Sequence, residues 1–197
     1  MLEFRCTDRP NKLPAVVFSD ASFVADMFAA LRPADPTFAS TRARANVAHA
    51  FYVWARPRGV RFVTSPLALE EIYRRLLFRE VDAALPGAGV KTWKELRTKD
   101  QTLFATKLSA GRKAVGRFHN AFTGMGIDLV MPGGRPTRSE LVAAKHVSLY
   151  VRALLAKYEI DAMDALHISL MRYAGLEWAI TADHDWWPVD TIRVILA

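Results

Sequence analysis

The sequence predicts an α/β protein in which helices cover both faces of a central parallel sheet. Two observations indicate this fold: short apolar runs recur along the 197-residue chain, and segments of helical character separate them. Strands covered on both faces carry continuous apolar runs, whereas half-exposed strands alternate apolar with polar residues. We therefore expect a three-layer α/β/α sandwich, formed by residues 1–197 as a single domain.

Five apolar runs are predicted to be strands. The first, AVVFS, is short, contains β-branched residues and follows Pro14, which bounds it. The second, RFVTS, ends where Pro66 can open a helix. In chain order, the predicted strands are 15–19, 61–65, 127–131, 178–181 and 191–196.

The segments between these runs carry helix signals. Pro33 ends the first helix, Pro57 follows the second, and Pro66 begins the third. PGAGV (86–90) and PGGRP (132–136) are expected breaks. In chain order, the predicted helices are 21–31, 37–56, 66–80, one or two helices up to about 123, 137–157 and 158–175.

The chain is basic, with a net charge of +7 and a sequence pI near 9.8, which favours an acidic partner such as nucleic acid. Most of the excess lies in residues 91–117, where eight cations stand against two acids, a net +6. The cations are Lys91, Lys94, Arg97, Lys99, Lys107, Arg112, Lys113 and Arg117. Trp93, Phe104 and Phe118 interleave with them, which fits either a nucleic-acid surface or a solvated helix face with inward aromatics.

Several classes are excluded by composition. Cys6 is the only cysteine, so neither an internal disulfide nor a thiolate metal cluster can form. No apolar run approaches the roughly 20 residues that span a bilayer. The start, MLEFRCTDRPNKLP, lacks the apolar core of a signal peptide, and we expect the protein in the cytoplasm.

Acidic residues follow two of the predicted strands. Asp20 comes directly after the first strand, and Asp183 and Asp185 come shortly after WAIT (178–181). Asp164 lies on the helix that leads into WAIT. Functional groups gather outside the carboxyl ends of parallel strands, so these carboxylates are expected to converge at one edge of the sheet.

Each acid also has a local explanation. Asp20 can cap the helix that follows it, and Asp164 can occupy the third helical position after an Asp161 cap. Asp183 and Asp185 can form a turn. Capping and turn formation do not require the carboxylates to meet at one sheet edge, so their convergence separates the two interpretations.

Asp164 stands beside an apolar stripe, because His167, Ile168 and Met171 lie three, four and seven residues further on. A carboxylate in this place is costly unless a cation or hydrogen bonds compensate it. His167 is interpreted either as a structural residue or as a further metal ligand.

Four segments follow one another along the chain: FSDASFV, TSPLALEEI, DALHISLMRYAG and ITADHDW. Together they resemble the four signature segments of the PIN-domain nucleases, and the chain is similar to VapC-type toxins and other stand-alone prokaryotic members. The resemblance covers about residues 15–80 and 127–197 and implies a PIN-like fold. The segment 81–126 is longer and more basic than a compact PIN domain needs, and we interpret it as an inserted helical subdomain.

The resemblance also implies residue roles. The catalytic and metal-binding acids of the family match Asp20, Glu71, Asp164 and Asp183, with Asp185 as an auxiliary ligand. Its small hydroxyl residue, assigned to substrate binding, matches Ser22. Spacing from Ser65 favours Glu71 for the second acid, although Glu70 borders the apolar face of the same helix.

The implied activity is hydrolysis of RNA by a Mg²⁺- or Mn²⁺-dependent endoribonuclease, with a toxin–antitoxin role as one expectation. Hard carboxylate ligands without cysteine favour these ions over Zn²⁺. RNA would be guided to the acids by basic residues of the insertion, namely Arg112, Lys113 and Arg117. The partners to test are RNA, a cognate antitoxin protein and a second copy of the chain.

Two other functions stay open: a metal-dependent DNA nuclease, and a non-catalytic RNA- or protein-binding module with the same fold. A haloacid-dehalogenase-type phosphatase is disfavoured, because it needs a second aspartate two residues after Asp20, where this chain has Ser22.

Overall fold

The structure, a computed structural model, describes residues 2–32, 42–130 and 138–197, with only the backbone of residues 138–146. The chain divides into two compact units, one formed by Met1–Ala68 with Gly126–Ala197 and the other by Leu69–Met125. The predicted insertion, 81–126, falls almost wholly in the second unit, which begins earlier because its first helix continues without a break.

The first unit contains a six-stranded sheet in which every pairing is parallel, as the apolar runs predict. In spatial order it reads β1-β6-β5-β2-β3-β4. The strands are β1 (Leu2–Arg5), β2 (Val16–Ser19), β3 (Arg61–Thr64), β4 (Ile127–Leu129), β5 (Trp178–Thr181) and β6 (Arg193–Leu196). β1 is not predicted from the sequence, because LEFR has charged residues between its apolar ones and becomes a strand only by pairing with β6.

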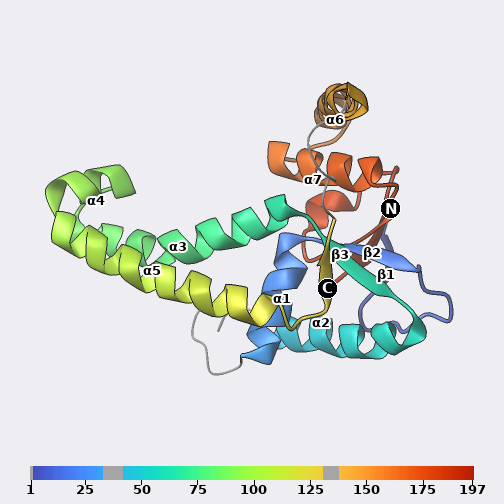
Figure 1. Cartoon of the computed structure of the whole chain (residues 1–197), viewed down its shortest axis with the longest axis horizontal. Coiled ribbons are helices and arrows are strands. Elements are labelled where there is room, and N and C mark those ends of the chain that lie inside the picture. Colours follow the sequence, from blue (N-terminus) through green and yellow to red (C-terminus); the bar gives the residue numbers. More distant parts are fainter. Residues whose placement is uncertain (1, 33–41, 131–137) are drawn as a thin grey trace. The chain divides into compact units, whose positions relative to one another are not determined.

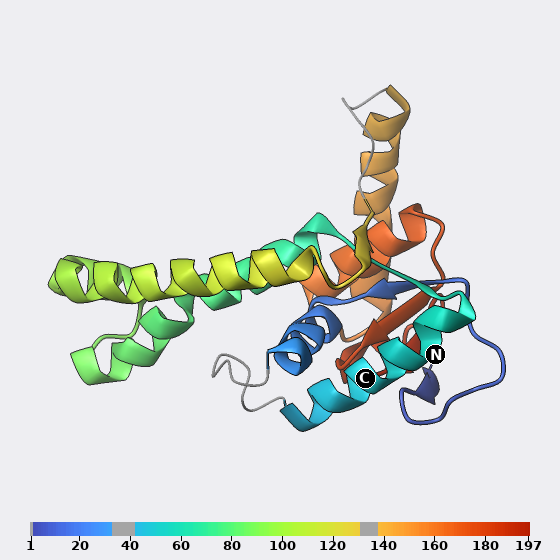
Figure 2. The same ribbon diagram turned by 60° about the horizontal axis from the view of Figure 1, so that its bottom comes forward.

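Helices cover both faces of this sheet, α1 and α2 on one face and α6 and α7 on the other (Figures 1 and 2). They are α1 (Ala21–Leu31), α2 (Arg42–Ala55), α6 (Arg138–Lys157) and α7 (Ala162–Tyr173). On the first face, Phe62 of β3 packs against Phe23 of α1 and Tyr52 of α2. On the second face, Phe18 of β2 and Ile168 of α7 belong to the same buried apolar cluster. The three-layer α/β/α arrangement is thus compatible with the prediction.

The second unit contains the rest of α3 (Pro66–Ala88), with α4 (Trp93–Lys99) and α5 (Gln101–Phe122). The sequence places the end of α3 near residue 80, which is wrong, because the helix runs to Ala88 and contains Pro86. The break expected at 86–90 is present only in its last two residues, Gly89 and Val90. Val81 and Leu85 pack against Leu96 and Phe104, and this burial outweighs the single backbone donor that Pro86 lacks. The basic segment, expected to form one or two helices, forms two.

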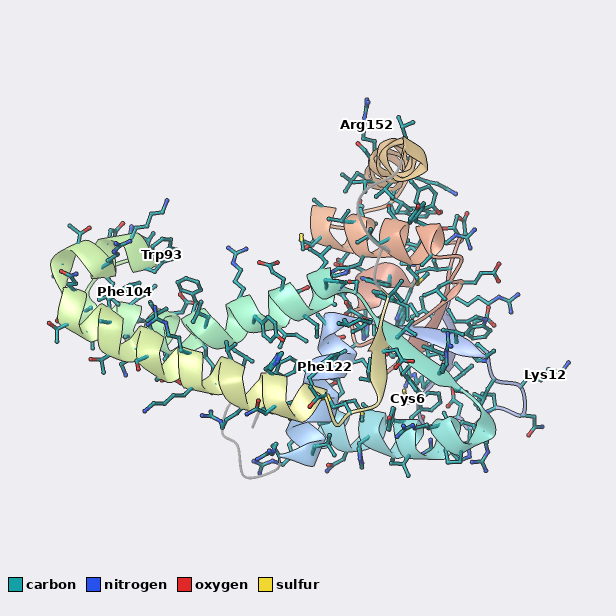
Figure 3. The ribbon with its side chains drawn as sticks, viewed as in Figure 1. Cys6, Lys12, Trp93, Phe104, Phe122 and Arg152 are labelled. Atoms are coloured by element: carbon teal, nitrogen blue, oxygen red, sulfur yellow. The ribbon has the colours of Figure 1, made fainter. Side chains whose placement is uncertain are left out.

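The aromatic residues of this basic segment face its own core. Trp93, the first residue of α4, packs against Phe104 of α5 (Figure 3), with ring centroids 6.3 Å apart. Phe104 is 9 % exposed and Phe118 is fully buried. The aromatics therefore stabilise the helical unit, whereas the lysines and arginines of the basic segment, apart from the half-buried Lys107, are exposed.

Four expectations fall partly or wholly outside the described ranges: residues 37–41 of the second predicted helix, Met131 of the third strand, the loop 132–136 and residue 137 of the helix predicted at 137–157. Within those ranges, no helix is both long and apolar enough to cross a membrane.

Candidate metal centre

The predicted acids lie at the point where the sheet reverses its strand order. β2 and β5 are neighbours at the centre of the sheet, with β3 and β4 on one side and β6 and β1 on the other. Asp20 directly follows β2, and its backbone N–H donates to Ile180 O of β5 at 3.1 Å. Asp183 stands two residues beyond the end of β5. Such a switch point, outside the carboxyl ends of parallel strands, is where open α/β sheets bind their ligands.

Three carboxylates meet there. Asp164, Asp183 and Asp185 each offer an oxygen, and these oxygens all lie within 4.8 Å of one another. Asp164 comes from the first turn of α7, and the other two come from the turn after β5. The convergence expected for these three residues is therefore present, although they are as much as 21 residues apart in the chain.

Asp164 does not cap its own helix. Asp161 is the N-cap of α7, and its Oδ1 accepts hydrogen bonds from the backbone N–H groups of Met163 and Asp164 at 2.7 and 2.8 Å. The Asp164 carboxylate instead accepts a 2.9 Å hydrogen bond from Trp186 Nε1. The predicted position of Asp164 after an Asp161 cap is confirmed, and its side chain is directed to the group of acids.

The surroundings of Asp164 favour its neutral form. Burial is the largest cause, and it raises the pKa of Asp164 from the usual 3.8 to about 7. The Trp186 hydrogen bond lowers this pKa, whereas the negative charges of Asp161, Asp183 and Asp20 raise it further. Asp20 is therefore close enough to Asp164 for their charges to interact.

Asp20 is held in place by hydroxyl groups. It is 7 % exposed, and its Oδ2 accepts hydrogen bonds from Ser22 Oγ at 2.9 Å and Thr181 Oγ1 at 3.0 Å. Thr181 Oγ1 also accepts from the backbone N–H of Asp183 at 2.9 Å, so one hydroxyl links the acids of the two strands. Asp20 additionally caps α1, accepting from Ser22 N at 3.3 Å. The capping role of Asp20 is thus confirmed, and its carboxylate lies outside the group of three converging oxygens, although its charge acts on Asp164.

Ser22 and Asp183 have local roles as well. Ser22 Oγ accepts from the backbone N–H of Ala182 at 2.9 Å, which ties α1 to the turn after β5. Asp183 accepts from the backbone N–H of Asp185 at 2.9 Å, as expected of a turn former. The substrate-binding role expected for Ser22 stays a prediction.

No lysine or arginine of the described segments forms an ion pair with these four aspartates. Among the described residues, the carboxylates at the switch point are therefore not paired with a basic side chain. A divalent cation with bonds of about 2.1 Å places opposite ligand oxygens about 4.2 Å apart. Oxygens already within 4.8 Å of one another need only a small adjustment to reach that geometry.

Glu71 belongs to the second unit, so its assignment to this centre stays a prediction. It is partly buried on α3 and forms an ion pair with Arg75, one helical turn away. Glu70, the alternative, is exposed and lines a groove on the same unit.

The predicted RNA-guiding residues also lie on the second unit. Arg112, Lys113 and Arg117 are exposed on α5. Arg112 shares an open groove of about 430 Å³ with Arg74 of α3. The whole unit carries eleven lysines and arginines against six acids, a net +5.

His167 is buried in α7 and lies outside the group of three carboxylates. Its ring centroid is 6.4 Å from those of Phe18 and Trp186. This aromatic surrounding favours the structural interpretation of the histidine over the ligand interpretation.

Sequence reasoning missed Trp186 and Thr181. From the sequence, a tryptophan that follows Asp183 and Asp185 would be taken only as a core residue, and Trp186 is indeed fully buried. A buried indole N–H needs an acceptor, however, and an aspartate at the edge of the core is such an acceptor. Thr181 was recognised only as the end of a strand, although its hydroxyl is shared between Asp20 and the turn.

Comparison of the chain with protein-family models, curated proteins and solved structures gives no match. The resemblance to PIN-domain nucleases therefore rests on the four sequence segments.

Proposed function

We propose that the chain is a Mg²⁺- or Mn²⁺-dependent endoribonuclease with a PIN-like fold. The observation that carries the proposal is the meeting of Asp164, Asp183 and Asp185 beside Asp20 at the switch point of the sheet. Caps and turns explain each acid singly, but they do not explain why Asp164 is turned toward the acids of another segment while Asp161 caps its helix.

The donor set fits a hard divalent cation. All three converging groups are carboxylates, which suit Mg²⁺ and Mn²⁺, and neither cysteine nor histidine belongs to the group. Asp164, Asp183 and Asp185 would hold the ion, with Asp20 next to them. A bound ion of this kind activates water and stabilises charge on phosphate oxygens.

The surrounding residues prepare the acids for this role. Ser22 and Thr181 fix the Asp20 carboxylate, and the Trp186 N–H fixes that of Asp164. Since the pKa of Asp164 is about 7, cation binding would displace a proton from part of the population at neutral pH. Affinity for the ion should consequently rise with pH up to that value.

RNA is the proposed substrate because the charge excess favours a polyanion. The exposed cations of the second unit, Arg112, Lys113 and Arg117 among them, offer contacts to phosphates. Glu71 remains the proposed fourth catalytic acid on the strength of the resemblance. The role of toxin, with an antitoxin as partner, is a narrower proposal that depends on a second protein.

The test is cleavage of single-stranded RNA by wild-type protein and by Asp164→Asn, each with Mg²⁺, Mn²⁺ or EDTA. Wild-type protein should cleave RNA only with metal, and Asp164→Asn should lose at least a hundredfold in rate, because an amide is a weaker, uncharged ligand. Glu159→Gln is the matched control, since it removes an exposed carboxylate five residues away.

Absence of cleavage by wild-type protein, or equal rates for wild-type and Asp164→Asn, would reject the catalytic assignment. DNA of the same sequence provides a second arm, in which preferential cleavage would identify a DNA nuclease instead.

A further inference from the structure

The first unit carries a strip of aromatic rings covered by arginines, and part of this strip lies at the amino ends of β5 and β6. Trp178, the first residue of β5, lies 6.0 Å from Phe4 of β1, measured between ring centroids. Phe4 lies 6.2 Å from Phe51 of α2, which lies 5.7 Å from Trp54. The four rings thus form a continuous row built from three elements.

Three arginines lie over this row. The guanidinium of Arg193 is 5.2 Å from the centroid of Trp178, and those of Arg9 and Arg58 are 5.0 and 4.7 Å from Trp54. Stacking on an aromatic face keeps a guanidinium flat and ordered while its N–H edges stay available. Arg58 is further fixed by a 2.6 Å hydrogen bond from Nη1 to Trp54 O.

The charge of this arginine–aromatic strip is uncompensated. No acid in the described part of the chain forms an ion pair with Arg9, Arg58 or Arg193, and Nη1 of Arg9 is buried there without a hydrogen-bond partner. A buried donor left unpaired is rare, and a phosphate oxygen is one acceptor that would satisfy it. Arg58 and Arg193 are exposed, so a ligand can reach the strip from solvent.

The geometry points to a second RNA-binding surface on this strip, in which the stacked arginines hold the phosphate backbone at a distance from the group of aspartates. This inference rests on the proposed function for the choice of RNA. An ordered guanidinium group can donate two parallel hydrogen bonds to phosphate oxygens. Because stacking already orders these side chains, binding costs them less conformational entropy. Contacts of this kind bind without regard to sequence.

Trp178 of the strip and the aspartates lie at opposite ends of β5. Trp178 begins β5 and Thr181 ends it, which separates them by about 10 Å at 3.3 Å per residue. One RNA would therefore have to pass along the unit to contact both. Long RNA should use the strip, whereas a mononucleotide bound at the aspartates should not.

The test measures binding of a long single-stranded RNA in EDTA, where cleavage is absent, at several salt concentrations. Arg58→Gln and Arg193→Gln should each weaken binding roughly threefold to tenfold and lower the salt slope by roughly 0.7. The matched control is Arg152→Gln, which removes one exposed charge that points outward from α6 (Figure 3) and should leave binding nearly unchanged.

Arg58→Lys and Arg193→Lys keep the positive charge but remove the planar guanidinium group. They therefore distinguish the effect of its geometry from that of its charge, without removing a cation from the fold. Lysine should restore the salt slope but not the full affinity, because it offers no planar fork. Equal melting temperatures by circular dichroism would confirm that the variants are folded.

Three outcomes would overturn the inference: wild-type protein that does not bind RNA in EDTA, salt slopes of Arg58→Gln and Arg193→Gln equal to that of Arg152→Gln, or arginine-dependent binding of poly-glutamate in place of RNA. Cleavage with metal is measured separately. A protein that cleaves RNA while the strip variants behave like the control would keep the proposed function and lose only this surface.

Discussion

At the scale of single residues, ionisation of Asp164 lowers the stability of the metal-free fold. Its carboxylate is partly buried beside Ile168 and faces the negative charges of Asp183 and Asp20, and its pKa is raised to about 7. A group whose pKa is higher in the folded than in the unfolded state stabilises the fold at low pH, and this contribution is lost as pH rises from about 4 to 7. At pH 8 the ionised side chain therefore lowers the free energy of unfolding of the metal-free protein.

Asp164→Asn should consequently raise the free energy of unfolding in EDTA at pH 8, and by less at pH 5. We expect a gain of about 1–2 kcal/mol at pH 8, below the full linkage value because the side chain is only partly buried. Urea unfolding at the two pH values measures the difference. A gain that is the same at both would mean that ionisation of Asp164 is not the source of the cost.

The residue scale also shows where sequence reasoning succeeds. Asp164, Asp183 and Asp185 could be predicted to converge because strand ends and a helix start constrain their backbone positions. The Trp186 hydrogen bond and the shared Thr181 hydroxyl depend on side-chain directions within a turn, which the spacing of residues does not determine.

At the scale of secondary-structure elements, the second unit depends on close contact between α3 and α5. A Cβ atom added at Gly111 of α5 would overlap the backbone carbonyl of Leu77 in α3. Neither backbone can yield as a flexible side chain would, so Gly111 allows the two helices to approach. Gly116, on the same helix, has no atom within 4 Å of an added Cβ.

Gly111→Ala should therefore destabilise the protein by about 1–3 kcal/mol, because it overpacks a helix crossing. Gly116→Ala should stabilise it by about 0.5–1 kcal/mol, since alanine is the better helix former. Chemical unfolding followed by circular dichroism gives both values. Equal effects of the two substitutions would show that α3 and α5 do not pack closely at Gly111.

Elements were predictable where local pattern and final environment agree. The five apolar runs became strands, all of them largely buried except β4, and Gly175 ends α7 with a positive φ of 73°, as a helix-terminating glycine does. β1 and the last turns of α3 were missed for one reason: pairing with β6 and packing against Leu96 lie far away in sequence. Tertiary contacts there override the local signals.

At the scale of the whole molecule, charge is divided between the two units. The second unit carries a net +5 of the total +7, while the first holds the group of aspartates. If the exposed cations of α5 guide RNA, their contribution should appear as counterion release. The buried aromatic residues of this unit should contribute no base stacking.

Replacing Arg112, Lys113 and Arg117 together with Gln should weaken RNA binding and lower its salt slope by roughly 2, from about 0.7 for each phosphate contact. Binding titrations at several salt concentrations measure the slope, and metal affinity serves as the control that should not change. An unchanged slope would leave these cations as a solvated helix face or as contacts to a protein partner such as an antitoxin.

The central claim is that Asp164, Asp183 and Asp185 bind a divalent cation, and direct titration with Mn²⁺ tests it without RNA or activity. Isothermal calorimetry at pH 7.5 should detect binding to wild-type protein and to Glu159→Gln alike. Asp164→Asn and Asp183→Asn should weaken it at least tenfold, because each removes a charged ligand. Wild-type affinity should also fall below pH 7, as Asp164 takes up its proton. Mn²⁺ affinity that is the same in Asp164→Asn, Asp183→Asn and wild-type protein would contradict the account.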